Sequence, residues 1–326
     1  MAERTLIEAV NLALTRAMSE DDRVVVVGED VGVDGGVFRA TDGLLQAFGA
    51  DRVLDTPLAE TVIAGLAVGL AAQGFRPVAE IQFMGFIDAT LDQMVNHASR
   101  LRTRTRGRLT CPMVMRAPYG GGIRAPEHHS ESTESMFAHI PGLRVVIPSS
   151  PQRAYGLLLA AIADPDPVVF LEPKRLYRSA RESFEDDGRS LPLDRCFVVR
   201  EGSDVTLISW GAMLAQTLLA GERLAEAGVA AEIIDVATLK PLDTATILAS
   251  VARTGRVVIV HEAALSCGFG AEIAARIAAQ GLFDLVAPIA RVAGYDTVMP
   301  LPKLERYYLP SVERIVDAAR EAVTYG

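Results

Sequence analysis

The stretch Asp55-Thr56-Pro57-Leu58-Ala59-Glu60, followed by the apolar run 61–72, decides the first half of the fold. Thr56 and Pro57 predict a helix start, because proline at the first helical position gives up an amide that has no partner there. No side chain from Val62 to Ala72 is charged, so the pattern predicts a helix buried on all sides. The run is too short to cross a bilayer, which needs about twenty apolar residues.

Two glycines and one carboxylate distinguish this helix. Gly65 and Gly69 each cost roughly 1 kcal/mol relative to alanine, which predicts a close helix crossing and a candidate subunit contact. Glu60 stands at the head of the helix beside a dry interior, where desolvation favours the protonated carboxyl group of a proton-handling acid. The alternative is an ordinary glutamate stabilised by the helix dipole.

Composition indicates a folded protein with room for two cores. The chain has 326 residues, of which 50% are hydrophobic and 22% charged, with a net charge of −9. The sequence has no sustained stripe of basic residues, so it does not predict nucleic-acid binding. We interpret the arginines in 100–108 as a solvated helix end or a subunit contact. Three cysteines without CxxC spacing, an acidic N-terminus and no secretory or membrane-spanning run predict a cytoplasmic protein.

Strands and helices alternate along both halves of the chain. Alternation of this kind predicts parallel sheets covered by helices, an α/β fold. The expected domains are 1–180 and 201–326, joined by a charged linker at 181–200. We expect strands at 24–27, 52–54, 77–83, 113–116, 143–147, 168–171, 204–210, 231–236 and 257–261, and helices at 5–18, 41–48, 56–72, 86–102, 151–163, 214–227, 244–253, 270–279 and within 307–325.

The loop that begins at Gly120-Gly121-Gly122 carries His128 and His129 between two glutamates. Two histidines between glutamates could bind a transition metal, but adjacent histidines point apart and no His-x-x-x-His spacing supports such a site. A loop histidine that acts on substrate is one interpretation and an ordinary surface histidine the other.

No nucleotide motif is complete in this chain. The loop at 120–122 lacks the Lys and Ser/Thr of a phosphate loop, and Gly268-Phe269-Gly270 lacks the third glycine of a dinucleotide fingerprint. Gly-Asp-Gly followed at a distance by Asn, the magnesium diphosphate anchor of thiamine enzymes, does not occur.

Several motifs together resemble the β subunit of the thiamine diphosphate-dependent 2-oxo acid dehydrogenases. They are 28–31, 36–39, 55–60, 77–83, 129–130 and 141–142. The segments 79–83, 171–178, 261–263 and 294–297 look most like the branched-chain members, with pyruvate and acetoin dehydrogenases as alternatives. Phe86, Met84-Gly85 and Glu131 depart from the branched-chain pattern.

This resemblance implies a transketolase-like pyrimidine-binding domain followed by a transketolase C-terminal domain, and it implies roles for five residues. Glu60 would hydrogen-bond the aminopyrimidine ring of thiamine diphosphate, while Leu58, Gln82 and Phe86 would line that ring. His129 would face the 2-oxo acid and assist acyl transfer to lipoamide.

The resemblance implies why the diphosphate anchor is missing from this chain: in this family the α subunit holds the magnesium and the diphosphate. The resemblance implies a heterotetramer of two α and two β chains and an acyltransferase core as a further partner. It also implies a potassium ion at Met113, Val114, Ala161, Asp164 and Asp166. The rival hypotheses are a non-catalytic assembly subunit and a nicotinamide oxidoreductase.

Overall fold

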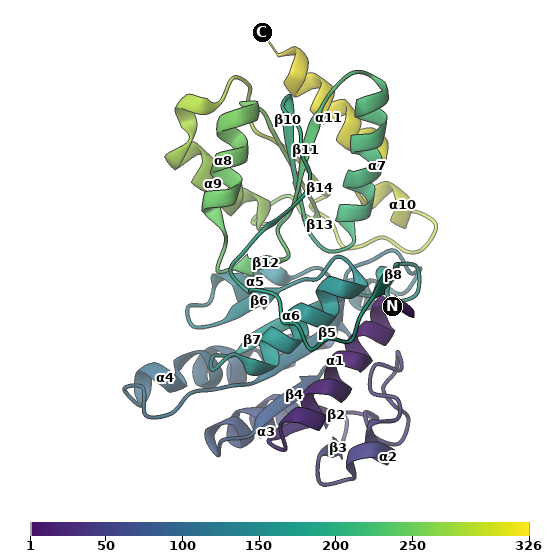
Figure 1. The fold of residues 1–326 in the computed structure, drawn as a ribbon, viewed down its shortest axis with the longest axis vertical. Coiled ribbons are helices and arrows are strands. Elements are labelled where there is room, and N and C mark those ends of the chain that lie inside the picture. Colours follow the sequence, from purple (N-terminus) through teal and green to yellow (C-terminus); the bar gives the residue numbers. More distant parts are fainter. Residues whose placement is uncertain (1, 326) are drawn as a thin grey trace. The chain divides into compact units, whose positions relative to one another are not determined.

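The computed structural model describes residues 2–325, and the chain forms two compact units (Figure 1). The first unit comprises Met1–Tyr119 and Met136–Leu193, and the second comprises Gly120–Ser135 and Asp194–Gly326. Among residues 2–325, no helix combines the length and the apolar character that crossing a membrane requires.

The first unit is built on a parallel sheet. Its strands follow the order β6-β7-β5-β4-β2-β3, and every pairing between these neighbours is parallel. Four consecutive valines make β2 buried along its whole length, as predicted for a central strand covered on both faces. The strands are β2 (Val24–Gly28), β3 (Val53–Asp55), β4 (Arg76–Glu80), β5 (Val114–Tyr119), β6 (Arg144–Val146) and β7 (Val168–Pro173).

Two long helices of this unit pack against each other and on the sheet: α1 (Leu6–Glu20) and α6 (Pro151–Ala163). The Thr5 hydroxyl caps α1 by accepting from the Glu8 amide, and the Glu8 carboxylate accepts from the Thr5 amide at 2.7 Å. The shorter helices are α2 (Leu44–Phe48), α3 (Glu60–Ala72), α4 (Leu101–Arg104) and α5 (Glu134–His139).

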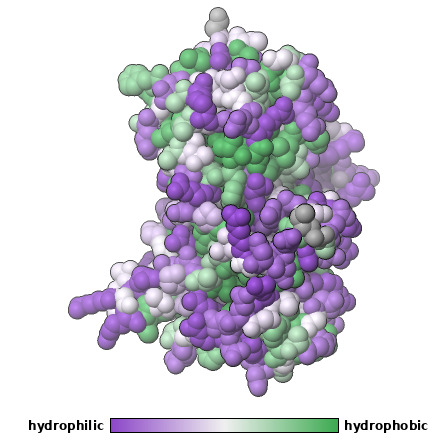
Figure 2. Space-filling view, viewed as in Figure 1, coloured by the Kyte–Doolittle hydropathy of each residue, from purple (hydrophilic) through white to green (hydrophobic). Residues whose placement is uncertain are grey.

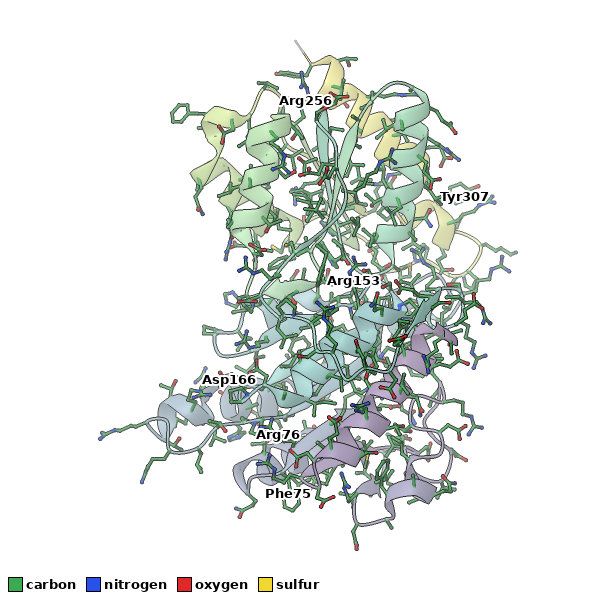
Figure 3. The ribbon with its side chains drawn as sticks, in the orientation of Figure 1. Phe75, Arg76, Arg153, Asp166, Arg256 and Tyr307 are labelled. Atoms are coloured by element: carbon green, nitrogen blue, oxygen red, sulfur yellow. The ribbon has the colours of Figure 1, made fainter. Side chains whose placement is uncertain are left out.

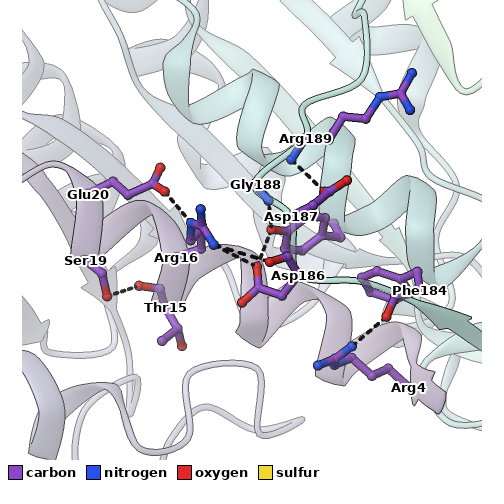
Figure 4. Close-up of polar contacts among 11 residues, drawn as sticks. Arg4, Thr15, Arg16, Ser19, Glu20, Phe184, Asp186, Asp187, Gly188 and Arg189 are labelled. Carbon is purple, nitrogen blue, oxygen red and sulfur yellow. Dashed lines mark hydrogen bonds and ion pairs between the residues drawn. The ribbon is translucent and has the colours of Figure 1, made fainter. Parts of the chain in front are cut away.

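Part of the segment expected as a linker has regular structure, because residues 181–184 form a strand. β8 (Arg181–Phe184) pairs antiparallel with β1 (Ala2–Thr5), and Arg4 donates to the Phe184 carbonyl at 3.0 Å. Arg16 of α1 then pairs with Asp186 (Figure 4). These contacts fasten the charged segment to the first unit.

The second unit has three layers. Its sheet follows the order β14-β13-β10-β11-β9, parallel except for β9, with α7 and α11 on one face and α8 and α9 on the other (Figure 1). The strands are β9 (Phe197–Arg200), β10 (Val205–Ser209), β11 (Ala231–Asp235), β12 (Thr238–Lys240), β13 (Val257–Ala264) and β14 (Ala290–Gly294), and the helices are α7 (Met213–Glu226), α8 (Thr244–Thr254), α9 (Gly270–Gln280), α10 (Glu305–Tyr308) and α11 (Val312–Thr324).

The helix expected at 86–102 is present as an unbroken helical run over residues 84–104, made of successive segments with different hydrogen-bond patterns. These are the 3₁₀ turns Met84–Thr90 and Ala98–Arg100, the π turn Gln93–His97 and α4. Within this series the Gln93 side chain reaches the backbone of α3 at Gly65. The change from 3₁₀ to π and back to α hydrogen bonding along this run is what the sequence pattern did not predict.

The arginine-rich end of this series is exposed. Arg102, Arg104, Arg106 and Arg108 are all open to solvent, and the space-filling view shows a hydrophilic projection there (Figure 2). This exposure in the single chain fits both interpretations made from the sequence, a solvated helix end and a subunit contact.

Candidate active site

The carboxyl ends of three neighbouring strands meet at one edge of the first unit's sheet. Gly28 at the end of β2 is in register with Asp55 of β3 and with Glu80 of β4. The segments that follow these strands therefore lie together, and the edge they form is where open α/β sheets bind ligands.

Glu60 is the first residue of α3, so that helix begins later than Thr56 and Pro57 predicted. The cause is a backbone bond, because the Thr56 amide donates to the Gly28 carbonyl at 2.9 Å and holds the chain extended. Leu58, in the turn before the helix, is 73% exposed, whereas Glu60 is half-buried.

Glu60 has acidic neighbours that the sequence did not single out as functional. Burial, then the charges of Asp30 and Glu60, raise the pKa of Glu29. Asp30 accepts a hydrogen bond of 3.3 Å from the Gln82 side-chain amide. In the sequence, the only signal for Glu29 and Asp30 was that the segment 28–31 matches the first turn of the family.

Gln82 and Phe86 follow β4, and both are half-buried. Phe86 packs edge-on against Phe83 with 6.1 Å between ring centroids, and Phe83 packs against Phe38 at 5.5 Å. Phe38 in turn contacts Tyr177 at 5.1 Å. A row of aromatic rings thus holds Phe86 beside the sheet edge that carries Glu60.

The residues at this edge fit the pyrimidine half of thiamine diphosphate. They offer a carboxyl group, an amide and an aromatic ring, and the buried Thr56 hydroxyl has no hydrogen-bond partner among residues 2–325. Such a donor set suits a flat heterocycle with ring nitrogens and an amino group.

The helix that follows Glu60 is not buried on all sides as predicted. Val62 is 55% exposed and Leu66 39% exposed, and a side chain at Gly69 would meet no atom within 4 Å. The other face is buried in the unit through Ile63 and Ala67. An apolar helix face is therefore open in the single chain.

His129 lies in the second unit, in the short 3₁₀ turn Glu127–His129. Its ring contacts that of His128 with 4.2 Å between centroids. Among residues 2–325, no three His, Cys, Asp or Glu side chains are grouped as a metal site would require.

The predicted potassium ligands lie around the turn before β7 and at the start of β5. Asp164 pairs with Arg144 at 2.9 Å and Asp166, labelled in Figure 3, pairs with Arg102 at 2.7 Å. The Ala161 carbonyl accepts from the Asp164 amide. The Met113 carbonyl accepts from the Val168 amide at 3.0 Å, and Val114 is the first residue of β5. Because both acid side chains already face arginines, a potassium site here stays a prediction that depends on main-chain oxygens.

Comparison with known proteins defines the class first. Residues 2–180 match the family described as "Transketolase, pyrimidine binding domain", and residues 194–315 match "Transketolase, C-terminal domain". A solved structure titled "Split gene transketolase, inactive beta4 tetramer" superposes with a TM-score of 0.81 at 25% identity, covering 98% of both chains. The chain is thus transketolase-like, which confirms the predicted fold class.

Relatives then narrow the class. The chain is 46% identical over 325 residues, 100% of both chains, to the "Pyruvate dehydrogenase E1 component subunit beta" of Bacillus subtilis (strain 168). It is 47% identical over 321 residues, 98% of both, to the protein of the same name from Acholeplasma laidlawii. The chain belongs to the family of E1 β subunits of the 2-oxo acid dehydrogenases. These names favour the pyruvate alternative over the branched-chain preference that the sequence motifs predicted.

Proposed function

We propose that this chain supplies the pyrimidine half of a thiamine diphosphate site in a 2-oxo acid dehydrogenase, with pyruvate as the substrate. The observation that carries the proposal is Glu60 at the sheet edge beside Gln82 and Phe86, in a chain without a diphosphate anchor. The names of the relatives support pyruvate, and a branched-chain 2-oxo acid is the alternative.

Bound thiamine diphosphate supplies a nucleophilic carbon that releases carbon dioxide from a 2-oxo acid. Glu60, at the start of α3, would share a proton with a nitrogen of the pyrimidine ring. Gln82, oriented by Asp30, would bond the ring edge, and Phe86 would pack on the ring face. His129 would orient the substrate and assist acyl transfer to lipoamide.

An α subunit would hold the magnesium and the diphosphate in a tetramer of two α and two β chains. The solved split-gene transketolase, whose title describes an inactive tetramer of β chains, supports the view that a β chain by itself is incomplete. The open apolar face of α3 is a candidate contact in the assembly. The acyltransferase core remains a further proposed partner.

Replacing Glu60 with Gln in the assembled enzyme tests the proposal. The amide keeps the shape of the side chain and cannot exchange the proton, so we expect decarboxylation to fall roughly 100-fold or more. Glu185→Gln, at an exposed carboxylate of the same unit, is the matched control and should leave turnover unchanged. Unchanged turnover in the Glu60 variant would remove this acid from the reaction.

Substrate choice needs a separate measurement. We expect pyruvate to give a higher kcat/KM than the 2-oxo acids derived from valine, leucine and isoleucine, assayed with the same assembled enzyme. The reverse order would restore the branched-chain prediction without affecting the role of Glu60.

A further inference from the structure

Three consecutive glycines begin the loop that carries His129, and neither the phosphate-loop pattern nor the proposed reaction explains them. The loop closes on itself, because the Gly120 amide donates to the Glu131 carbonyl at 2.9 Å. The residues between these two positions form a compact turn of the second unit, with His129 near its end.

A buried carboxylate binds the first half of this loop. Glu305 of α10 is 5% exposed, and its two oxygens accept from two main-chain amides: Gly122 at 2.7 Å and Arg124 at 3.2 Å. Gly122 and Arg124 both have positive φ, 91° and 60° respectively. The left-handed conformation costs free energy at Arg124, which is not a glycine. The hydrogen bonds to Glu305 therefore hold the backbone in a conformation that it would otherwise leave.

A second buried carboxylate binds the other half. Glu262 at the end of β13 is 3% exposed and accepts from the Ser132 hydroxyl at 2.9 Å. A side chain at Gly120 would collide with this same carboxylate, and one at Gly121 would lie 2.5 Å from the Met299 methyl group. Gly120 also has a φ of 82°, which disfavours any other residue there, whereas at Gly121 the flexible end of Met299 would have to move to admit a side chain.

We infer that Glu305 and Glu262 form a clamp that holds the loop 120–132 in one conformation, and that Glu305 is a positioning residue for His129. The inference rests on the proposed role of His129 in acyl transfer. Two carboxylates from separate elements fix the loop at both ends, so the histidine between them keeps one place relative to the second unit. Loss of either bond should loosen the loop without removing any group that touches the substrate.

The test uses Glu305→Gln in the enzyme assembled with its α partner. Both carboxylate oxygens accept from amides, so a glutamine must turn its NH₂ group toward one N–H and lose that bond. We expect hydrogen exchange of peptides covering 121–126 to speed up roughly tenfold or more, while peptides from β13 and α11 are unchanged. Glu313→Gln, at an exposed acid of α11 bound to Arg223, is the matched control and should leave the loop protected.

Two activities separate positioning from a general loss of structure. We expect acyl transfer to lipoamide to fall roughly tenfold and decarboxylation with an artificial electron acceptor to fall by less, because His129 is proposed both to orient the 2-oxo acid and to assist acyl transfer. In the background of His129→Ala, Glu305→Gln should cause no further loss of either activity, because both substitutions act through the same histidine. If the two losses multiply, or if loop exchange is unchanged, the inference is wrong.

A second variant covers the case in which Glu305→Gln does not fold. Ser132→Ala removes only the hydroxyl that binds Glu262, and it should speed loop exchange and lower acyl transfer in the same direction. A fully protected loop in Ser132→Ala would then overturn the clamp. If His129→Ala itself leaves both activities unchanged, the proposed role of His129 fails, and loop exchange alone decides whether the clamp exists.

Discussion

Arg116 lies between two acids in the core of the first unit, in the strand β5 that neighbours β4. Glu172 accepts from Nε and Nη2 of Arg116, each at 2.7 Å, and also from the Tyr177 hydroxyl at 2.6 Å. Glu80 accepts from Nη1. Burial, with the charge of Glu172 added, raises the pKa of Glu80, because one arginine faces two carboxylates. This group supports Tyr177, the far end of the aromatic row that reaches Phe86.

Removing the shared cation should therefore be costly. We expect Arg116→Met to lower the free energy of unfolding by about 3–5 kcal/mol, since it leaves two buried acids facing each other. Glu80→Gln should lower the free energy of unfolding much less, because the glutamine keeps an oxygen that accepts from Arg116 and the second buried negative charge is gone. Chemical denaturation measures the free energy of unfolding of both variants. Arg102→Met is the control, because the exposed ion pair between Arg102 and Asp166 contributes about 1 kcal/mol or less. Equal losses for the two arginines would contradict this account.

His261 of β13 is the second buried titratable group with a predictable effect. Its ring stacks on Trp210 at 5.3 Å, and Gly268 and Gly270 leave the room that it occupies. Burial, then the charge of Arg291, lowers the pKa of His261 to about 4. The Gly268-Phe269-Gly270 pattern, which resembled a dinucleotide fingerprint, thus has a packing cause that no sequence spacing reveals.

This histidine should make stability depend on pH. The unfolded chain binds a proton near pH 6.5 and the folded chain only near pH 4, so the stabilisation is complete above pH 6.5 and is lost as pH falls toward 4. We expect a loss of roughly 2 kcal/mol between pH 7 and pH 5 that His261→Gln removes. His139→Gln, at an exposed histidine, should keep the wild-type slope. A slope that is equal in all three proteins would rule out His261 as its source.

At the scale of elements, the local sequence pattern predicted most strands and helices. It failed where hydrogen bonds between residues far apart in the sequence determine where an element begins or whether it forms. The valine run of β2 and the helix α6, which begins at Pro151 and ends at Ala163, were predictable because burial and capping are written in neighbouring residues. The start of α3 was not, since a bond from Thr56 to Gly28 delays it. Nor was β8, whose partner strand β1 lies at the other end of the unit in sequence.

The open face of α3 gives a prediction at the same scale. A charge placed at Leu66, which is exposed in the single chain, should leave the fold intact and prevent burial of that face in the assembly. We expect Leu66→Glu to weaken assembly with the α chain roughly tenfold or more, measured by analytical ultracentrifugation. Leu219→Glu, at an exposed leucine of α7, is the control. Normal assembly of the Leu66 variant would show that another surface makes the contact.

At the scale of the whole molecule, the family was predictable and the substrate was not. Residues 2–180 and 194–315 match the two transketolase domain families, as the motifs implied, whereas the segments that looked branched-chain belong to a chain whose relatives are named for pyruvate. If the pocket is shared with an α subunit, this chain carries only part of the substrate contacts. Its own residues then predict the reaction better than the 2-oxo acid.

The central claim is that this chain forms half of a cofactor site, and calorimetric titration of thiamine diphosphate with magnesium tests it most directly. The titration is run on the chain alone and on the chain assembled with its α partner. We predict that the chain alone binds roughly 100-fold or more weakly, since it lacks charge-assisted bonds to the diphosphate. Binding by the chain alone that is as tight as binding by the assembly would contradict the account.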